Sequence, residues 1–287
     1  MRSTARRTAR PLIIALVAAA GVLAPGATAT AGQPSAVSTY DTAVLADDPV
    51  GYWQMSNAAA ASEPDASGHG RTGTYTGNRA SVALPNGDNA ADFDGATGYL
   101  QIADNAVLSP ATTGEFTIEA WMRPDTLQFD NFEGSGYVHW MGKGTPNQHE
   151  YVARMYNQTN DEDRPNRISG YSFNLDGGLG AGSYFQDPVT TTAWIHYVLV
   201  INPSATSSAY PNGYTKVYRD GVLRDQDQLS INGIVITPAD GTAPLRIGTR
   251  DLGSFFDGAV GKVAVYDNEL SPERIKAHTD AMTAGGQ

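Results

Sequence analysis

Cysteine is absent from all 287 residues of the chain. No disulfide can therefore hold the fold together, and thiol catalysis and cysteine–zinc sites are excluded. Stability has to come from an apolar core, with or without a bound metal. About 250 residues are enough to bury such a core in one large domain or two small ones.

Basic residues are scarce: 19 Lys and Arg stand against 30 Asp and Glu, which gives a net charge of −11. Four of the arginines lie within the first ten residues, and no Lys or Arg cluster follows. Because nucleic-acid binding needs a basic surface that neutralises phosphates, we expect no nucleic-acid partner. The average charge also disfavours acidic polysaccharides and membrane surfaces and favours neutral glycans or cations, although it leaves a local basic site open. We expect no organic cofactor.

Long apolar runs are also missing, apart from Leu12–Ala24. This run follows the four arginines and precedes the small-residue site Ala29-Thr30-Ala31, as in a secretory signal peptide. It is shorter than the roughly 20 apolar residues that cross a bilayer. We therefore predict a signal peptide over 1–31, a short linker over 32–39, a secreted and extracellular protein, and no membrane insertion. Cleavage takes the net charge from −11 to −15.

Short apolar segments separated by Gly and Pro fill the rest of the chain and indicate strands. In Phe116–Met122, apolar and polar residues alternate, and Trp194–Ile201 is apolar on both faces apart from His196. Asp220-Gly221 is typical of a two-residue hairpin turn. The strands that these patterns predict are Phe116–Met122, Trp194–Ile201, the hairpin Lys216–Leu223, Leu245–Gly248 and Gly258–Tyr266.

One mature segment has a helical pattern, with Ser271 as cap and Pro272 at the first helical position, and we expect it to reach about His278. Many strands and one terminal helix predict an all-β, antiparallel two-sheet jelly-roll sandwich over residues 40–282. We expect fraying from Ala281, with 283–287 as a tail. Gln128–Tyr137 and Asn157–Gly182 are polar and Gly-rich, which predicts long surface loops that bind a ligand or are simply mobile.

The segments resemble, in order, the laminin G-like (concanavalin A-like) jelly-roll family of secreted bacterial type. The matching segments of the first half are Tyr40–Asp47, Pro49–Trp53, Asp65–Gly70, Gly73–Gly77, Ala91–Gly95 and Tyr99–Ile102. Those of the second half are Phe116–Trp121, Gly142–Gly144, Trp194–His196, Tyr218–Gly221, Arg246–Gly248, Phe256–Tyr266 and Leu270–Ser271. The resemblance implies a jelly-roll fold. It also implies a function among lectins and glycan-binding modules, commonly with a rim calcium, or among glycosidases and lyases.

Calcium is the metal that the resemblance suggests, at the turn Asp65–Gly70. Asp65, Ser67 and the backbone carbonyl of His69 could supply hard oxygen ligands. The alternative is that Asp65 and Ser67 only hydrogen-bond the backbone of an Asx turn. The chain also departs from the family at Gly261-Lys262, where an acidic residue is common.

Glycan binding is predicted at an aromatic cluster in the loop-rich stretch, because sugar C–H faces stack on flat apolar rings. Phe132, Tyr137 and Trp140 would stack, and Asn147 and Gln148 would donate and accept hydrogen bonds. The alternative is a small satellite core under a long loop. Trp53, Trp121 and Trp194 lie in strand segments and are expected to pack in the core.

Catalysis is the alternative function, as a glycoside hydrolase or a polysaccharide lyase. A glycosidase needs two facing carboxylates, and Glu119 is a candidate for one of them. The alternative is that Glu119 is an ordinary strand residue that pairs with a neighbouring side chain. A lyase needs a Tyr or His base and a cation that neutralises a uronate, for which His139, Tyr151 and Arg154, with Tyr171, are candidates. His196 is expected to be a hydrogen-bonded core histidine. The sequence therefore predicts a secreted carbohydrate-binding protein, and leaves an extracellular polysaccharide-degrading enzyme on the same scaffold open.

Overall fold

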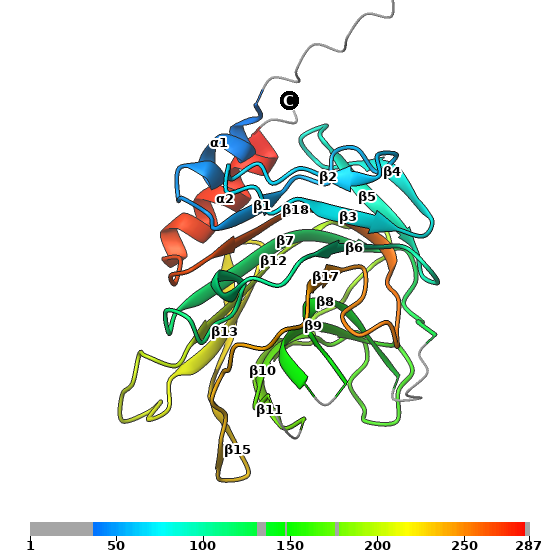
Figure 1. Cartoon of the computed structure of the whole chain (residues 1–287). Helices are drawn as coiled ribbons and strands as arrows, with labels where there is room; N and C mark the ends of the chain where they lie inside the picture. The colour runs from blue at the N-terminus through cyan, green and yellow to red at the C-terminus, as the bar shows by residue number, and fades with distance from the viewer. Residues whose placement is uncertain (1–36, 131–135, 147, 176–177, 285–287) are drawn as a thin grey trace, which may run out of the picture. The chain divides into compact units, whose positions relative to one another are not determined.

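Strands with an apolar inner face stack into two antiparallel sheets in the computed structural model (Figure 1), which describes residues 37–130, 136–146, 148–175 and 178–284. The predicted signal peptide, Phe132 and Asn147 lie outside these residues. Sheet A runs β14-β13-β12-β7-β18-β5-β4, with β1 also paired to β18, and sheet B runs β11-β10-β9-β8-β17-β6-β3-β2. The antiparallel jelly-roll sandwich predicted from the sequence is confirmed.

The strands of sheet A are β1 (Gly51–Trp53), β4 (Arg79–Ala83), β5 (Asn89–Asp94), β7 (Phe116–Pro124), β12 (Ile195–Asn202), β13 (Tyr214–Arg219), β14 (Val222–Gln228) and β18 (Asp257–Tyr266). Those of sheet B are β2 (Ser62–Glu63), β3 (Gly73–Thr76), β6 (Tyr99–Ile102), β8 (Tyr137–Thr145), β9 (Gln148–Tyr156), β10 (Ile168–Phe173), β11 (Gly180–Phe185) and β17 (Leu245–Ile247). The remaining elements are the hairpin β15 (Ser230–Ile231) and β16 (Ile234–Val235), the helices α1 (Thr39–Leu45) and α2 (Pro272–Ala284), and the 3-10 turn η1 (Ala106–Leu108).

The five predicted strand segments all form strands, because their signals are local. Phe116 and Ile118 of β7 face the core between the sheets, and Trp121 faces the opposite side. All residues of β12 are buried, as its two apolar faces predicted. Asp220 and Gly221 both have positive φ, 53° and 79°, and join β13 to β14 as the two-residue turn requires.

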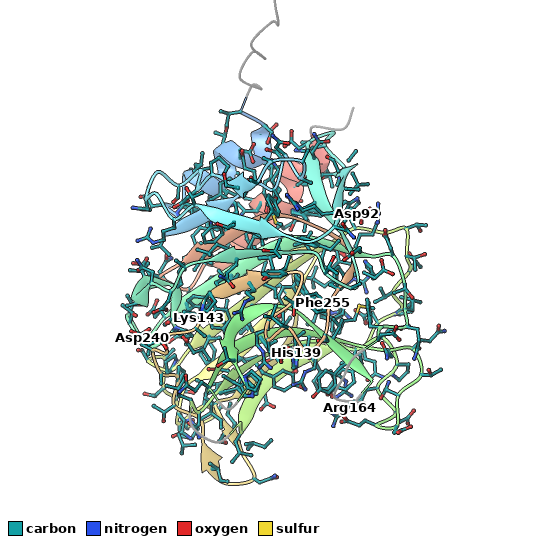
Figure 2. The ribbon with its side chains drawn as sticks, turned by 45° about the vertical axis from the view of Figure 1, so that its right-hand side comes forward. Asp92, His139, Lys143, Arg164, Asp240 and Phe255 are labelled. Carbon is teal, nitrogen blue, oxygen red and sulfur yellow. The ribbon has the colours of Figure 1, made fainter. Side chains whose placement is uncertain are left out.

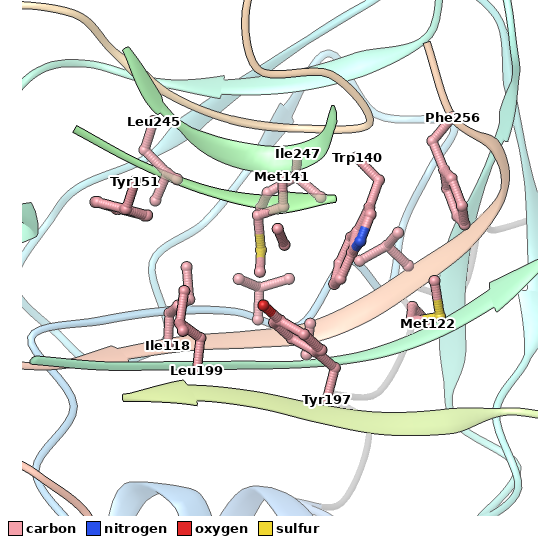
Figure 3. Packing of buried hydrophobic residues seen from close by; sticks show 14 of the residues in the cluster. Ile118, Met122, Trp140, Met141, Tyr151, Tyr197, Leu199, Leu245, Ile247 and Phe256 are labelled. Carbon is pink, nitrogen blue, oxygen red and sulfur yellow. The ribbon is translucent and has the colours of Figure 1, made fainter. Parts of the chain in front are cut away.

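Trp140 is a core residue of β8, which corrects its prediction as a surface sugar platform. Its side chain is fully buried between the sheets and packs edge-on against Tyr197, with ring centroids 5.0 Å apart, and 6.0 Å from Phe256 (Figure 3). Aromatic pairs of this kind add about 0.5–1.5 kcal/mol beyond the burial of their area. Because no face of the indole meets solvent, Trp140 cannot stack on a sugar.

The prediction of a long surface loop over Asn157–Gly182 is partly wrong, because this range contains β10 and the start of β11. In β10 the inward positions hold Ile168 and Gly170, and the outward ones hold Ser169, Tyr171 and Phe173. Because several positions of β10 hold glycine or serine, the segment contains no apolar run, and its composition is typical of a loop.

Two helices cover the outer face of sheet A, whereas the sequence predicted one. The helix α1 falls partly within the predicted linker and begins at a capping box, in which Ser38 accepts from the Asp41 backbone and Asp41 accepts in return. The helix α2 starts after Ser271 as predicted but continues to Ala284, which corrects the predicted fraying from Ala281. Met282 explains the extension, since it is fully buried.

Lys262 anchors α1 at the position where the sequence departs from the family pattern. Its ammonium is buried and lies 2.6 Å from Asp41 of α1 and 2.7 Å from Asp88. A charge removed from water needs such partners. The chain therefore uses a cation here to fix a helix, where an acidic residue is common in the family.

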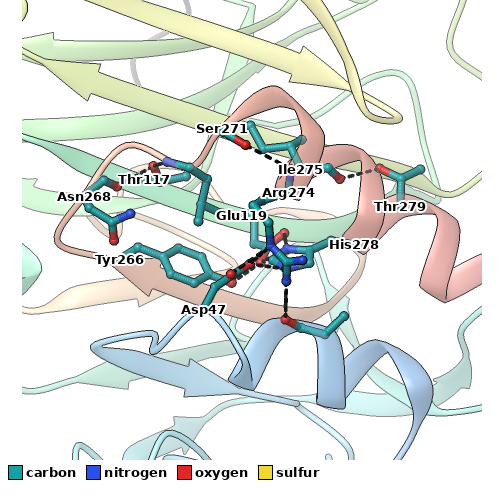
Figure 4. A network of polar contacts seen from close by, with 12 residues as sticks. Asp47, Thr117, Glu119, Tyr266, Asn268, Ser271, Arg274, Ile275, His278 and Thr279 are labelled. Carbon is teal, nitrogen blue, oxygen red and sulfur yellow. Dashed lines mark hydrogen bonds and ion pairs between the residues drawn. The ribbon is translucent and has the colours of Figure 1, made fainter.

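Glu119 is buried on the outer face of β7, under the helices (Figure 4). Its carboxylate lies 2.8 Å from His196 and 3.0 Å from His278 of α2, and it accepts the Tyr266 hydroxyl. The second ring nitrogen of His278 lies 2.9 Å from Asp47, which follows α1. The core role predicted for His196 is confirmed. The prediction of Glu119 as a catalytic carboxylate is wrong, because no substrate can reach it.

Because His278 is paired with Glu119, we expect the free energy of unfolding to depend on pH. Burial alone lowers the pKa of His278, but the Glu119 charge outweighs it and the net shift is upward. A raised folded pKa gives stability that is complete below the unfolded pKa of about 6.5 and is lost as the pH rises through the folded value. We expect His278→Gln to cost about 3 kcal/mol at pH 6, and less as the pH rises.

Urea unfolding at pH 6 to 9 measures this dependence. Lys276→Gln is the control, because Lys276 lies on the exposed side of the same helix. When the free energy of unfolding is plotted against pH, the curve of Lys276→Gln should run parallel to that of the wild type. The curve of His278→Gln should approach the wild-type curve as the pH rises. Parallel curves for all three proteins would show that the buried pair does not titrate in this range.

Candidate functional site

The outer face of sheet B carries a group of aromatic and basic side chains from three adjacent strands. The register places Tyr137 opposite Tyr156 and His139 opposite Arg154, and Tyr171 lies diagonally next to Arg154 on β10. Because side chains two residues apart share a face of a strand, all five point away from the core. We call these five residues, Tyr137, His139, Arg154, Tyr156 and Tyr171, the arginine–tyrosine face. In Figure 2, His139 marks its position, with Arg164 beside it.

Arg154 lies at the centre of this face, among tyrosine rings. Its guanidinium carbon is 4.1 Å from the centre of the Tyr137 ring, 4.9 Å from Tyr171 and 5.9 Å from Tyr156. A cation over an aromatic face gains about 0.5–2 kcal/mol, more when water is excluded. Arg154, Tyr137 and Tyr171 are half-buried, so a ligand can still contact them.

Two glycines of β11 let aromatic rings of β10 lie close to the sheet. A Cβ atom at Gly182 would come within 2.7 Å of the Tyr171 ring, and one at Gly180 within 2.6 Å of the Phe173 ring. The glycines face these residues directly across the strand pair. Any larger residue would push the rings outward, so the glycines let the Tyr171 and Phe173 rings lie against the sheet, tilted by 40° to each other.

His139 is held in one tautomer by its neighbours. Arg154 Nε donates to its Nε2 at 3.1 Å, so Nδ1 carries the proton and donates to Asp251 at 3.1 Å. Burial and the charges of Arg250 and Arg154 lower the pKa of His139 to about 3, so the ring is neutral at pH 7. With both nitrogens occupied, His139 orients Arg154.

The segment 249–255 crosses this end of sheet B and supplies two charges that sequence analysis missed. Arg250 donates to His149 at 2.7 Å and pairs with Asp251. Ser254 fixes the segment to β8 by accepting the backbone N–H of His139 at 3.0 Å. The only sequence signal was a charged Arg-Asp pair two residues after a predicted strand.

The surroundings of the arginine–tyrosine face are basic, although the chain as a whole is acidic. Arg154, Arg246 and Arg250 lie on or against this side of sheet B, and Asp251 offsets one of their charges. Arg246 bonds Gln101 and the Arg250 carbonyl, at 2.9 and 2.6 Å. The local basic site that average charge left open is therefore present.

The remaining catalytic and glycan candidates lie elsewhere. Tyr151 is buried on the core side, donates to the Leu108 carbonyl at 3.0 Å, and has a pKa raised by burial, so it is wrong as a base. Gln148 is exposed at the start of β9, away from the Arg154 end of that strand. His139, Arg154 and Tyr171 are the predicted residues that the fold brings together, with Tyr137 from the glycan set.

The Asp65 turn has the geometry of the Asx alternative. One carboxylate oxygen accepts the Tyr52 and Ser67 backbone N–H groups, each at 3.0 Å, and the Ser67 hydroxyl, and the other accepts Arg71 N–H at 2.9 Å. His69 is exposed. Within the described ranges, no group of three or more His, Asp and Glu is arranged to hold a metal. Calcium at this turn stays a prediction.

No helix among the described residues has the length and apolar character needed to cross a membrane.

Solved structures with the same fold include sugar complexes. Domain 4 of the extracellular GH43 arabinanase AbnA from Geobacillus stearothermophilus, in complex with arabinotriose, is 17% identical with a TM-score of 0.56, over 81% of this chain and 98% of that domain. The botulinum neurotoxin serotype D ligand binding domain, in complex with N-acetylneuraminic acid, is 14% identical with a TM-score of 0.58, over 85% of this chain. The match covers 52% of that domain, about half its length.

Another similar structure is the binding domain of botulinum neurotoxin DC in complex with rat synaptotagmin II, 13% identical with a TM-score of 0.58, over 83% of this chain and 52% of that one. A comparison with curated proteins found no significant match. Identities this low establish a shared fold and nothing finer. A sequence model of one family matches residues 94–276, which is more than half of the chain. The protein therefore belongs to the concanavalin A-like lectin/glucanase superfamily.

Proposed function

We propose that this chain is a secreted glycan-binding protein whose ligand lies on the arginine–tyrosine face. The observation that carries the proposal is the set of half-buried tyrosine rings around Arg154, on strands rather than on loops. Pyranose rings stack their C–H faces on such rings, and neighbouring polar groups fix their orientation. Secretion is supported by the arginine-rich start and apolar run of residues 1–31.

The structural neighbours support glycan as the ligand class. The arabinanase domain is in complex with arabinotriose and the serotype D neurotoxin domain with N-acetylneuraminic acid, so this fold accommodates sugars in proteins of distant sequence. The outer face of sheet A is less suited to this role, because α1 and α2 cover part of it. Sheet B presents its aromatic groups on the opposite side of the sandwich.

An extracellular lyase is the second candidate, because the fold brings together His139, Arg154 and Tyr171. The protonation states favour binding over catalysis. Both His139 nitrogens are occupied, and burial raises the pKa of Tyr171, so neither group is ready to accept a proton at pH 7. The same argument weakens a hydrolase, since Asp251 is held ionised by His139 and Arg250 and cannot act as the acid.

We expect Tyr171→Ala to weaken glycan binding about 10-fold, the equivalent of about 1.4 kcal/mol, because it removes a stacking ring. Affinity electrophoresis over a panel of neutral and acidic polysaccharides measures the change. Tyr210→Ala is the matched control, a half-buried tyrosine in the loop between β12 and β13. Equal affinity of both variants and the wild type would remove the proposed site. Reducing ends and unsaturated-uronate absorbance, followed in the same mixtures, should stay at background, and product formation would favour the enzyme.

Calcium at the Asp65 turn is the remaining part of the proposal. We expect Asp65→Ala to cost about 2 kcal/mol in chelator, because several hydrogen bonds to one charged group are lost. Calcium should raise the melting temperature of the wild type and leave that of Asp65→Ala unchanged, since a ligand stabilises only a folded state that binds it. Asp161→Ala, in an exposed acidic run, is the control. Equal melting temperatures of the wild type with calcium and with chelator would remove calcium from the account.

A further inference from the structure

We infer that the glycan bound on the arginine–tyrosine face carries a carboxylate, and that Arg154 binds this group. The inference rests on the proposed function and adds the chemical class of the sugar. It departs from the expectation, based on average charge, that neutral glycans suit this protein best. One guanidinium nitrogen of Arg154 is a hydrogen-bond donor that the described part of the chain leaves unused.

The contacts of Arg154 show which nitrogen this is. Its Nε donates to His139 at 3.1 Å and its Nη1 to the Tyr156 hydroxyl at 3.3 Å, whereas its Nη2 has no hydrogen-bond partner among the described residues. No described carboxylate lies within 4.0 Å of its guanidinium. Six other arginines have one, namely Arg123, Arg164, Arg219, Arg224, Arg250 and Arg274. Among the described residues, the arginines without one also include Arg71, Arg79, Arg167 and Arg246, which bond to carbonyl or amide oxygens, so the unused Nη2 of Arg154 and its position among the tyrosine rings are what point to a ligand.

The Tyr156 hydroxyl orients Arg154. Its oxygen accepts Nη1 of Arg154 at 3.3 Å and Nη1 of Arg164 at 2.9 Å. The side chain is 1% exposed, so it helps to hold Arg154 and does not itself contact a ligand. Arg164 is paired with Glu162 at 2.5 Å, whereas Arg154 has no such partner among the described residues.

A carboxylate supplies what this arrangement lacks. It accepts several hydrogen bonds, and its planar geometry matches the guanidinium fork. The rings of Tyr137 and Tyr171 hold the guanidinium in place, so little conformational entropy is lost on binding. Arg246 and Arg250 add positive charge nearby, which attracts an anion. A uronic acid combines this carboxylate with a pyranose ring that can stack on a tyrosine.

Isothermal titration of the mature protein compares three uronate polymers with their neutral forms. Polygalacturonate, alginate and hyaluronate are each paired with the same polymer after its carboxyl groups are reduced to alcohols. We expect at least one uronate polymer to bind 10-fold or more tightly than its reduced form. This preference should disappear in Arg154→Gln and decrease in Arg154→Lys, which keeps the charge and loses the fork.

Arg123→Gln is the matched control, because Arg123 also lies over an aromatic ring, that of Trp194, but is paired with Asp125. It should keep the preference. Equal binding of native and reduced polymers would overturn the inference that the glycan carries a carboxylate. It would leave the proposed function intact, provided that Tyr171→Ala still weakens binding. Equal binding of dextran sulfate would overturn it in favour of a general anion site. If no polymer binds, the proposed function fails as well.

Discussion

The burial of Glu119 is the constraint on which the arrangement of this molecule depends. A carboxylate inside the fold needs charged partners, and His278 of α2 is one of them. The pair therefore attaches α2 to sheet A, and the contact of His278 with Asp47 extends the attachment to the end of α1. The part of the face that the helices cover cannot bind a polysaccharide. Sheet B, on the other side of the core, keeps the half-buried rings that a sugar could contact.

The two sheets use their outward positions differently, although both rest on the same core. In β7 of sheet A, the outward Glu119 and Trp121 are buried under helices. In β9 and β10 of sheet B, the outward Arg154 and Tyr171 are half-buried and contact each other. Since the strands are fixed by core packing, the side chains that they carry are held at fixed spacing, which favours binding a repeating polymer.

Local sequence patterns predict much of the fold. The elements that they miss are those in which the regular alternation of apolar and polar residues is interrupted or too short to recognise. The alternation in β7 and the Asp220-Gly221 turn are complete within a few residues. In β8 the register shifts between His139 and Met141, so the alternation is interrupted next to Trp140, and the local pattern is not that of a strand. The short helix α1 was missed because its main signal is a capping box at Ser38 and Asp41.

The candidate site was predictable only in part, for a related reason. His139 and Arg154 were named from their residue types, and the strand pairing then placed them opposite each other. Tyr151 was grouped with them but lies three residues from Arg154, and an odd spacing in a strand puts two side chains on opposite faces. Arg250 reaches the site through a segment about 100 residues further along the chain, and a single sequence holds no record of such a contact.

Hydrogen–deuterium exchange with and without a bound uronate oligosaccharide tests the central claim most directly, because it locates the ligand on one sheet or the other. The account predicts slower exchange in β8, β9, β10 and the segment 249–255, with β7, β12 and the helices unchanged. Protection confined to sheet A or to the rim turn at residues 65–70 would contradict it.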